Sequence, residues 1–370
     1  MTGPPPGLRI AVTGSTGLLG TAVVAALRAS GQRVTRLVRR APAGQDEVGW
    51  DPRAPSGGIA PGALDGLNAV IHLAGAGVAG HRWTPAYQEE IRASRVLGTR
   101  ALAGALAAAG PPPAVLLAGS AIGWYGDTGG REVDESAPSG DGFLADVVRE
   151  WEAAAQPARQ AGIRVVHMRT GIVLTRQGGV LARMLPLFRL GLGSRLGSVR
   201  QVTSWIALAD YLGAVQFLLA RADLAGPVNL TAPHPVSNAE FTAALAAALN
   251  RPALLAVPAP ALRLALGGVT SDLLSSARVL PRRLARPATG SGSRTCQPHW
   301  RLSWRRRRPP DWPLRRPARS LPSAHWCGSA SAAEANLTRA GAPTPVPRGQ
   351  VPSRGRAGRH PGSRTRRFRR

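Results

Sequence analysis

The stretch Thr13-Gly-Ser-Thr-Gly-Leu-Leu-Gly20 carries three glycines in the spacing G-x-x-G-x-x-G. It follows an apolar, β-forming run at Leu8–Thr13 and opens an alanine- and leucine-rich stretch that is typical of a helix. Such a strand–turn–helix junction is characteristic of dinucleotide binding, because the helix N-terminus offers free N–H groups and a positive dipole end to a pyrophosphate.

The residues of this loop have separate expected roles. Gly14 allows a tight turn, Gly17 lets the backbone approach the pyrophosphate, and Gly20 permits close packing of the helix on the strand. The predicted binding loop is completed by Ser15, Thr16, Leu18 and Leu19. A plain turn is the alternative, since the chain contains 44 glycines. The position of the match at the first strand–helix junction favours dinucleotide binding.

Strand and helix signals alternate beyond the loop. Strands are predicted at Arg33–Val38, Ala69–Leu73, Val115–Ala118 and Arg164–Met168, and helices at Pro85–Ala109 and Phe143–Ala161. Repeated β-α-β units predict a parallel sheet covered by helices on both faces, which is a Rossmann-type doubly wound α/β fold.

Beyond residue 175 the alternation loosens, and the sequence predicts a smaller lobe. Ser204–Ala220 suits a short strand and a helix, and Ser237-Asn-Ala-Glu240 is a capping box before a helix at Phe241–Asn250. We therefore expect a disordered lead at 1–7 and a Rossmann domain at 8–176 that also receives about 203–230. A small interleaved C-terminal α/β lobe is expected at 177–202 and 231–284, closing over the carboxyl edge of the sheet, where ligands bind in such folds.

The end of the second predicted strand bears on the choice of cofactor. An NAD site carries Asp or Glu about 20 residues beyond the last glycine, where the carboxylate binds the ribose 2′-hydroxyl. Here the strand ends in Val38-Arg39-Arg40, and Asp46 and Glu47 come too late to serve easily. Two guanidinium groups, Arg39 and Arg40, suit a 2′-phosphate, so NADP is favoured over NAD. A solvated arginine pair is the alternative.

Charge divides the chain at residue 284. The 370 residues carry a net charge of +27 and no lysine, so all 47 basic residues are arginine. Residues 1–284 hold 27 Arg and 18 acidic residues, a net charge of +9, whereas residues 285–370 hold 20 Arg and 2 acidic residues, a net charge of +18. The second segment has only 7 Leu, Ile, Val and Phe residues, too few for a core, so we expect a disordered basic tail.

Two hypotheses account for the tail. The first, which we favour, holds that residues 285–370 are largely an out-of-frame translation, because the break falls inside a domain rather than after one. Codons back-translated from Ala285–Trp304 and read in a shifted frame give an aromatic alternation followed by helix formers. The second is an arginine-rich arm that binds nucleic acid through phosphate contacts, with the tail's tryptophans stacking on bases.

Cysteine usage and apolar runs indicate the compartment. Both cysteines, Cys296 and Cys327, lie in the tail, too sparse for a zinc site, and we expect no metal. Residues 1–284 therefore carry no disulfide framework, which fits a reducing compartment. No apolar run reaches the length of a membrane helix, and Met1–Gly7 lacks the features of a signal peptide. We expect a cytoplasmic protein without a membrane partner.

Eight further stretches carry a family resemblance. They are HLAGAGVAGHRWT (72–84), IRASRVLGTRAL (91–102), GSAIGWYGD (119–127), GDGFLADVVREWE (140–152), RTGIVL (169–174), SWIALAD (204–210), VPAPALRLALGG (257–268) and RVLPRRL (278–284). With the glycine loop, they resemble the atypical, epimerase-like subgroup of the extended short-chain dehydrogenases/reductases, which has a small C-terminal domain of unknown function. The resemblance covers nearly all of 8–284.

The resemblance implies roles for several residues. Leu73, Ala74 and Gly75 would line the adenine and ribose side of the cofactor, and Arg169 would lie beside the nicotinamide. Ser120 would occupy the position that polarises a substrate carbonyl by hydrogen bonding.

One departure from the wider family concerns the mechanism. Standard members use a Tyr-x-x-x-Lys pair, in which the ammonium lowers the pKa of the phenol and orients the cofactor ribose. Phe143 and Val147 stand at those two positions here, a substitution that the epimerase-like subgroup shares. Hydride transfer stays feasible, but the usual acid is missing.

Three polar residues are candidates for the missing functions. Tyr125 could face the nicotinamide as a catalytic residue, Asp141 could act as a base, and Arg95 could bind an acidic substrate group or a cofactor phosphate. The plainer alternatives are that Tyr125 packs beside its tryptophan neighbour, that Asp141 caps a helix, and that Arg95 lies on a solvated helix face. His72 and His167 lie inside apolar strands and are expected to be packed and hydrogen-bonded.

These observations predict an NADP(H)-binding oxidoreductase or epimerase that acts on an unknown small carbonyl or sugar-like substrate. Two alternatives stay open. One is a non-catalytic NADP(H)-binding sensor or scaffold, which the missing Tyr/Lys pair supports, and the other is nucleic-acid binding through the tail. The sequence sets neither the substrate nor the oligomeric state.

Overall fold

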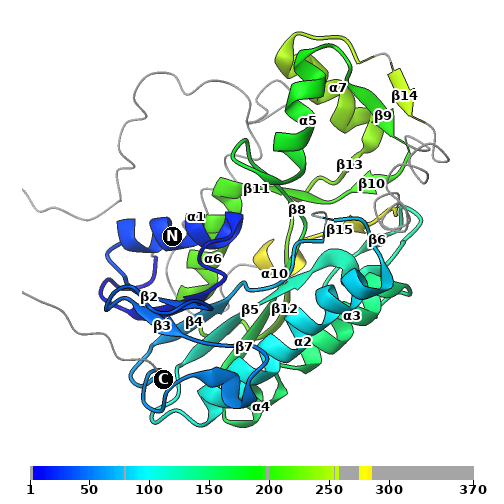
Figure 1. The fold of residues 1–370 in the computed structure, drawn as a ribbon. Coiled ribbons are helices and arrows are strands. Elements are labelled where there is room, and N and C mark those ends of the chain that lie inside the picture. The colour runs from blue at the N-terminus through cyan, green and yellow to red at the C-terminus, as the bar shows by residue number, and fades with distance from the viewer. Residues whose placement is uncertain (1–2, 79–80, 197–199, 254, 258–274, 286–370) are drawn as a thin grey trace, which may run out of the picture. The chain divides into compact units, whose positions relative to one another are not determined.

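The computed structural model describes residues 3–78, 81–196, 200–253, 255–257 and 275–285 (Figure 1). All of them lie in the first of two units of the chain, Met1–Arg316. Of the predicted basic tail, only Ala285 is described. The cysteines, the tail tryptophans and both hypotheses about the tail therefore lie outside the described residues.

A seven-stranded parallel sheet forms the centre of the fold, in the order β12-β7-β5-β4-β1-β2-β3. Its strands are β1 (Arg9–Thr13), β2 (Arg33–Val38), β3 (Glu47–Gly49), β4 (Ala69–His72), β5 (Val115–Ala121), β7 (Arg164–Thr170) and β12 (Gly226–Leu230). The chain runs outward from β1 to β3, returns to β4 beside β1, and then runs outward the other way. The predicted Rossmann-type fold is confirmed, and its switch point lies between β1 and β4, where such sheets bind ligands.

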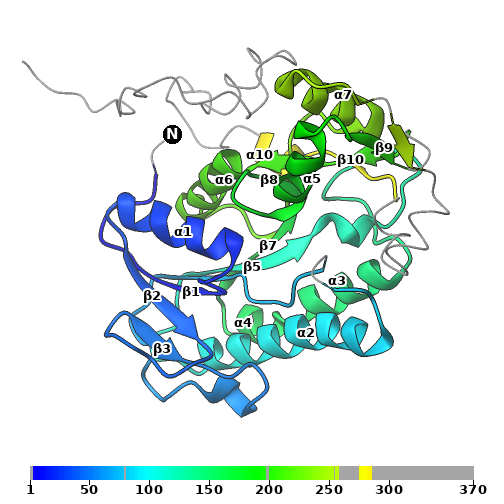
Figure 2. The same cartoon turned by 45° about the horizontal axis from the view of Figure 1, so that its top comes forward.

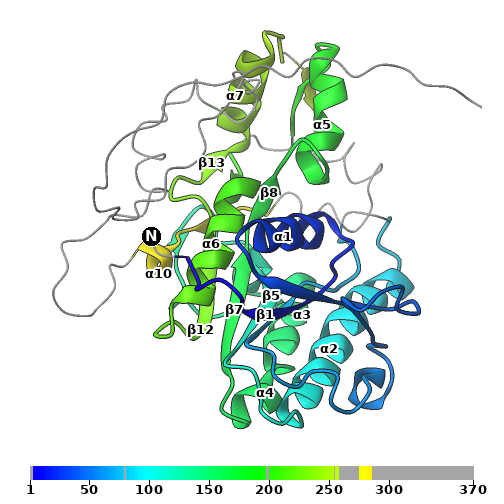
Figure 3. The same ribbon diagram turned by 90° about the vertical axis from the view of Figure 1, so that its left-hand side faces the viewer.

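Helices cover both faces of the sheet because its strands are apolar on both faces. Ile10 and Val12 of β1 belong to one core and Ala11, between them, to the other. One face is covered by α1 (Leu18–Ala29) and α6 (Leu208–Ala220), and the other by α2 (Pro85–Ala107), α3 (Phe143–Ala153) and α4 (Gln156–Gln160) (Figures 2 and 3). Continuous apolar runs such as β1 are what a doubly covered parallel sheet requires.

One predicted helix is interrupted. The pattern predicted a continuous helix over Phe143–Ala161, but α3 ends at Ala153 and α4 begins at Gln156, with Pro157 in its first turn. Proline lacks an N–H group and its ring clashes with the carbonyl of the preceding turn, so the helix restarts there. The prediction for β2 matches the structure at both ends.

A smaller group of elements follows β7. These elements are β8 (Ile172–Leu174), α5 (Gly179–Arg189), β9 (Ser194–Leu196), β10 (Val202–Thr203), β11 (Trp205–Ala207), β13 (Val236–Ser237), α7 (Asn238–Leu249) and β14 (Leu255–Val257). Two-stranded pairs form between β8 and β11, β10 and β13, and β9 and β14. α5 and α7 share a core of their own, which includes Leu185, Phe241 and Trp205. Figure 1 shows α5 and α7 together, away from the large sheet.

The predicted capping box is present at the start of α7. The Glu240 backbone N–H donates to the Ser237 hydroxyl, and the Ser237 backbone N–H donates to the Glu240 carboxylate. Because Ser237 is the cap, α7 begins at Asn238, three residues before the predicted start. The sequence did not predict α5, whose proline and flanking glycines obscure its pattern.

The N-terminal lead contacts the body of the fold. We predicted residues 1–7 as disordered, but the Gln32 side chain donates to the Pro5 carbonyl at 3.1 Å, and the Gly7 N–H donates to the Gly31 carbonyl at 3.0 Å. The described part of this lead, from Gly3, thus meets the turn between α1 and β2. In the part of the chain that the structure describes, no helix has both the length and the hydropathy needed to cross a membrane.

The last described residues return to the large sheet. β15 (Arg278–Val279) pairs with β6 (Glu132–Val133), and α10 (Arg282–Ala285) buries Leu284 in the core beneath α1 and α6. Residues 275–285 thus contact the sheet domain through β6 and Leu284, and they contact β10 of the small lobe through hydrogen bonds between Val202 and residues 276–277. Within the described ranges, two short turns of 3₁₀ helix complete the elements, η1 (Pro55–Gly58) and η2 (Ile122–Tyr125).

Candidate functional site

The glycine loop joins β1 to α1 at the carboxyl edge of the sheet (Figure 2). Gly14 has a φ of +65°, and a Cβ at this position would lie 2.7 Å from the carbonyl carbon of Leu73. A Cβ on Gly20 would overlap the Gly14 carbonyl oxygen and lie 2.7 Å from the Gly14 carbonyl carbon. Both positions meet backbone rather than flexible side chains, so only glycine fits either of them.

The start of α1 fits the phosphates of a dinucleotide. Gly17 caps the helix, no acidic residue occupies its first turn, and the first N–H groups of a helix lack partners within it. The hydroxyl of Ser15 is buried and has no hydrogen-bond partner among the described residues. Thr16 is exposed. Leu18 lies against Gly178 of the small lobe, where an added Cβ would lie 2.9 Å from Cδ1 of Leu18. The loop thus offers unpaired donors beside the positive end of a helix.

Thr13 links the glycine loop to the loop that follows β4. Its Oγ1 accepts hydrogen bonds from the N–H groups of Leu73 at 3.1 Å and Ala74 at 3.3 Å. The Thr13 proton therefore points to Nδ1 of His72 at 2.7 Å, so Nε2 carries the ring proton and donates to Thr99 at 3.0 Å. Complete burial lowers the pKa of His72 to about 4, which keeps the ring neutral. His72 is the packed, hydrogen-bonded residue that we expected.

The two predicted phosphate-binding arginines have different surroundings. Arg40 forms a two-pronged ion pair with Glu47 of β3 at 2.6 and 2.8 Å, and Arg36 binds the same carboxylate at 2.7 Å. The hydrogen bond from Arg40 is the largest of the effects that hold the pKa of Glu47 below its usual value. Arg39 is exposed and forms no hydrogen bond or ion pair within the described ranges. Of the two, Arg39 has the guanidinium that is free to bind a 2′-phosphate.

Ser120 begins a chain of buried polar side chains. Its hydroxyl donates to Glu152 of α3 at 2.6 Å, and the two oxygens of Glu152 accept from Nε and Nη2 of Arg169 at 2.8 and 2.9 Å. Nη1 of Arg169 donates to the hydroxyl of Tyr125 at 3.1 Å, and that hydroxyl donates to Asn229 at 2.8 Å. The parallel register places Ser120, Arg169 and Asn229 in one row across β5, β7 and β12.

This chain of hydrogen-bonded side chains, here called the polar row, runs from Ser120 through Glu152, Arg169 and Tyr125 to Asn229. Three predicted site residues thereby have buried partners inside the protein. Tyr125 is 3% exposed, and burial raises the pKa of its phenol. Arg169 is 2% exposed and lies 3.9 Å over the ring of Trp124, and Ser120 is 5% exposed. The structure thus brings Ser120, Tyr125 and Arg169 together, with their polar atoms directed at one another. Their roles toward a cofactor or substrate stay predictions.

Arg95 is not on a solvated helix face. It is half-buried, and its Nη1 and Nη2 donate to the carbonyls of Ile91 at 3.0 Å and Ala76 at 2.9 Å. Burial lowers the pKa of Arg95 to about 10, so it stays protonated at neutral pH. The side chain therefore lies against the loop that follows β4, two residues beyond Ala74.

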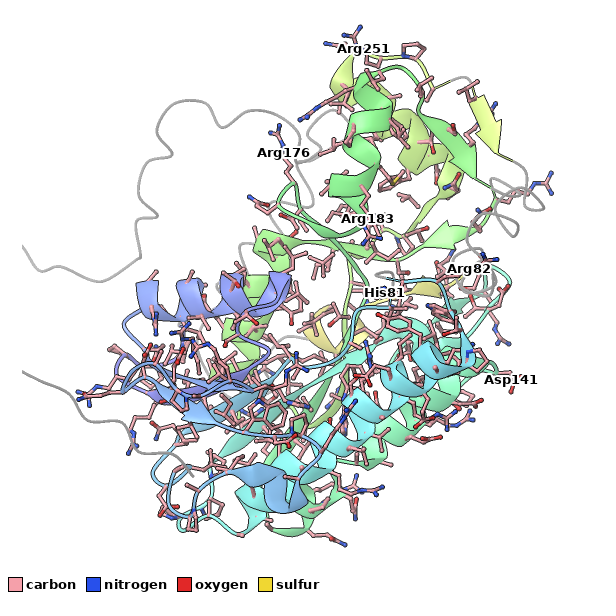
Figure 4. The ribbon with its side chains drawn as sticks, in the orientation of Figure 1. His81, Arg82, Asp141, Arg176, Arg183 and Arg251 are labelled. Atoms are coloured by element: carbon pink, nitrogen blue, oxygen red, sulfur yellow. The ribbon has the colours of Figure 1, made fainter. Side chains whose placement is uncertain are left out.

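The other expectations have mixed outcomes. Asp141 points outward (Figure 4), and α3 is capped by Gly142 without a side-chain hydrogen bond, so the capping interpretation is wrong. His167 is buried as expected, but its Nδ1 has no hydrogen-bond partner among the described residues. No cluster of His, Cys, Asp and Glu with a metal-binding arrangement occurs within the described ranges.

Sequence reasoning missed Glu152 and Asn229, which organise the polar row. A signal for Glu152 existed, because Arg169 stands in the stretch VVHMRT (165–170), whose other residues are mostly apolar and carry no charge. A buried guanidinium needs a carboxylate partner, and an acid on a helix that covers the strand is the nearest source. Asn229 carries no such signal in the sequence.

This strand order, with the glycine loop Gly14–Gly20 (the glycine cradle) at the switch point and a small lobe after β7, defines a dinucleotide-binding protein of the extended short-chain dehydrogenase/reductase class. Residues 10–230 match the sequence family described as the NAD dependent epimerase/dehydratase family. The chain belongs to this family, and the predicted resemblance is confirmed.

Relatives with long, shared alignments support the assignment. The epimerase family protein Mb2239 of Mycobacterium bovis is 49% identical over 278 residues, which are 75% of this chain and 91% of that protein. The crystal structure of the human epimerase family protein SDR39U1 (isoform 2) with NADPH is 34% identical, with a TM-score of 0.68 over 75% of this chain and 92% of that one. A nucleoside-diphosphate sugar epimerase from Corynebacterium glutamicum is 36% identical, with a TM-score of 0.61 over 75% of this chain and 54% of that one.

Proposed function

We propose that this protein binds NADP(H) and acts as an oxidoreductase or epimerase on a small carbonyl or sugar-like substrate. The observation that carries the proposal is the glycine cradle, in which Gly14 and Gly20 admit no side chain and the hydroxyl of Ser15 lacks a partner in the described chain. The human relative crystallised with NADPH supports the same cofactor.

Each part of the cofactor has residues to hold it. The loop Gly14–Gly20 holds the pyrophosphate, and Arg39 at the end of β2 binds the 2′-phosphate. Leu73, Ala74 and Gly75 line the adenosine side after β4, where Thr13 fixes the backbone. When bound, NADP(H) supplies or accepts a hydride at its nicotinamide ring.

The residues of the polar row move the proton. Ser120 holds the substrate oxygen, and in the direction of alcohol oxidation its hydroxyl takes the substrate proton as its own proton passes to Glu152, 2.6 Å away. Arg169 holds both oxygens of Glu152 in place. Tyr125, which we predicted as catalytic, is here a positioning residue, since its phenol holds Arg169 and is buried.

A turnover assay with matched variants tests this proposal. NADPH oxidation is followed spectrophotometrically against a panel of aldehydes, ketones and keto sugars. We expect Ser120→Ala to lose turnover and keep its affinity for NADPH. Ser30→Ala is the control, because the Ser30 hydroxyl donates to the Leu27 carbonyl at the end of α1, at the other edge of the sheet. Equal turnover in both variants would remove Ser120 from the mechanism.

The second candidate is a non-catalytic sensor or scaffold that binds NADP(H). It is favoured by the burial of the Ser120 and Tyr125 hydroxyls and by their hydrogen bonds to protein groups. Tight NADPH binding without turnover of any substrate in the panel would favour the sensor over the enzyme.

A further inference from the structure

Arg95 carries a charge that no acidic side chain among the described residues neutralises. Its two hydrogen bonds go to backbone carbonyls, of Ile91 and Ala76. A guanidinium has five N–H donors, so donors remain for another acceptor. Arg169, which is buried in the same sheet domain, is paired with Glu152. A half-buried cation without a carboxylate is expensive to maintain and marks a place where a ligand supplies the acceptor.

The position of Arg95 adjoins the cofactor loop. A Cβ on Gly75 would lie 3.4 Å from Cγ and 3.6 Å from Nη1 of Arg95. Ser94, the neighbouring residue, accepts a hydrogen bond from the Ala76 N–H at 3.0 Å, so α2 holds both polar groups of Ala76. The loop that follows β4 meets the glycine cradle through Leu73 and meets Arg95 through Gly75 and Ala76.

Arg95 also adjoins the place where a lysine is missing. Val147, which stands where standard members carry that lysine, is buried in one cluster with Ile91. Arg95 follows Ile91 by one helical turn on α2, and Trp151 follows Val147 by one turn on α3. The Arg95 guanidinium lies 5.1 Å from the centre of the Trp151 ring. The two helices therefore bring a cation to the neighbourhood of Val147 from a different part of the sequence.

We propose that Arg95 binds the nicotinamide-ribose half of NADP(H). It supplies the positive charge that is missing because Val147 stands in place of the lysine. The inference rests on the proposed binding of NADP(H), but not on turnover. The remaining N–H groups of Arg95 donate to the ribose hydroxyl oxygens, which fixes that half of the cofactor beside Ser120. Arg39 and the glycine loop hold the other half, so the two halves have separable binding residues.

Two ligands distinguish the halves in calorimetric titrations of the full chain. NADPH carries both halves, whereas adenosine 2′,5′-bisphosphate carries the adenine and the 2′-phosphate without the nicotinamide ribose. We expect Arg95→Met to weaken NADPH binding by about tenfold, as for the loss of one hydrogen bond from a charged group. Binding of adenosine 2′,5′-bisphosphate should be unchanged. Arg100→Met, on an exposed position of the same helix, is the control and should change neither.

Each other outcome bears on the proposal. Equal weakening of both ligands would reduce Arg95 to a support of the Ala76 loop, and no weakening of either would remove it from the site; both results overturn the inference. If Arg95→Met does not fold, Arg95→Gln is compared in the same way. A wild-type protein that binds NADPH without turnover contradicts the proposed enzyme and leaves this test intact. One that does not bind NADPH overturns the cofactor proposal and this inference with it.

Discussion

Replacing Gly20 with alanine should distort the glycine loop and lower the free energy of unfolding. The added Cβ would overlap the Gly14 carbonyl oxygen and lie 2.7 Å from the Gly14 carbonyl carbon, whereas ordinary contact begins at 3.4 Å, so the two pieces of backbone must separate by more than about 0.7 Å. Overpacking of this kind costs about 1–3 kcal/mol. Alanine in a helix returns roughly 0.5–1 kcal/mol relative to glycine. From the middle of both ranges, we expect a net loss of about 1 kcal/mol in the free energy of unfolding.

The matched control is Gly104→Ala in α2, where a Cβ would meet nothing within 4 Å. This variant gains the helix propensity without the overlap and should be more stable than wild type by about 0.5–1 kcal/mol. Urea unfolding followed by circular dichroism measures both changes. Gly20→Ala should also weaken NADPH binding by about tenfold for each 1.4 kcal/mol of loop strain. If Gly20→Ala is as stable as Gly104→Ala and binds NADPH as tightly as wild type, the glycine loop does not require glycine at position 20.

Three further predictions concern buried polar groups. Tyr125→Phe should lower the free energy of unfolding by about 1.5–3 kcal/mol, because the hydroxyl links Arg169 to Asn229. Tyr211→Phe should raise it by about 1 kcal/mol, because that buried hydroxyl has no partner among the described residues; urea unfolding that gave the reverse order would contradict both. The pKa of His72 is lowered from 6.5 to about 4, so the unfolded chain binds a proton that the folded chain does not, and stability that is complete above pH 6.5 falls as the pH drops. Between pH 7 and pH 5 the loss should be about 2 kcal/mol, and His72→Gln should remove it; a wild type with the same pH dependence as the variant would contradict this.

Features that neighbouring residues determine were predictable from the sequence. The glycine loop, β2 and the capping box of α7 each depend on a few adjacent positions, and the structure contains all three. The break between α3 and α4 was equally local, since Pro157 marks it. The prediction of a continuous helix gave the apolar pattern more weight than the proline, and the proline decided the structure.

Features that depend on strand register were not predictable in this way. Tyr125 and Asn229 are separated by 104 residues, and they meet because β12 returns to the edge of the sheet beside β7. Glu47 was set aside as too far along the chain, yet the register of β3 on β2 places it opposite Arg36. It also pairs with Arg40, which makes the two predicted phosphate-binding arginines unequal. Telling Arg39 from Arg40 requires the position of β3, and a strand of three residues is too short to predict from its sequence pattern.

The proposed roles of the glycine loop and Arg39 in holding NADP(H) can be measured through the ratio of the affinities for NADPH and NADH. Calorimetric titration of the wild type should give NADPH the tighter binding by about tenfold or more, as expected for a charged hydrogen bond to the 2′-phosphate. Arg39→Gln should bring the ratio of the NADPH and NADH affinities close to one. Arg33→Gln, at the amino end of the same strand, should leave the ratio unchanged. Equal affinities of the wild type for the two cofactors, or an unchanged ratio in Arg39→Gln, would show that Arg39 does not bind the 2′-phosphate.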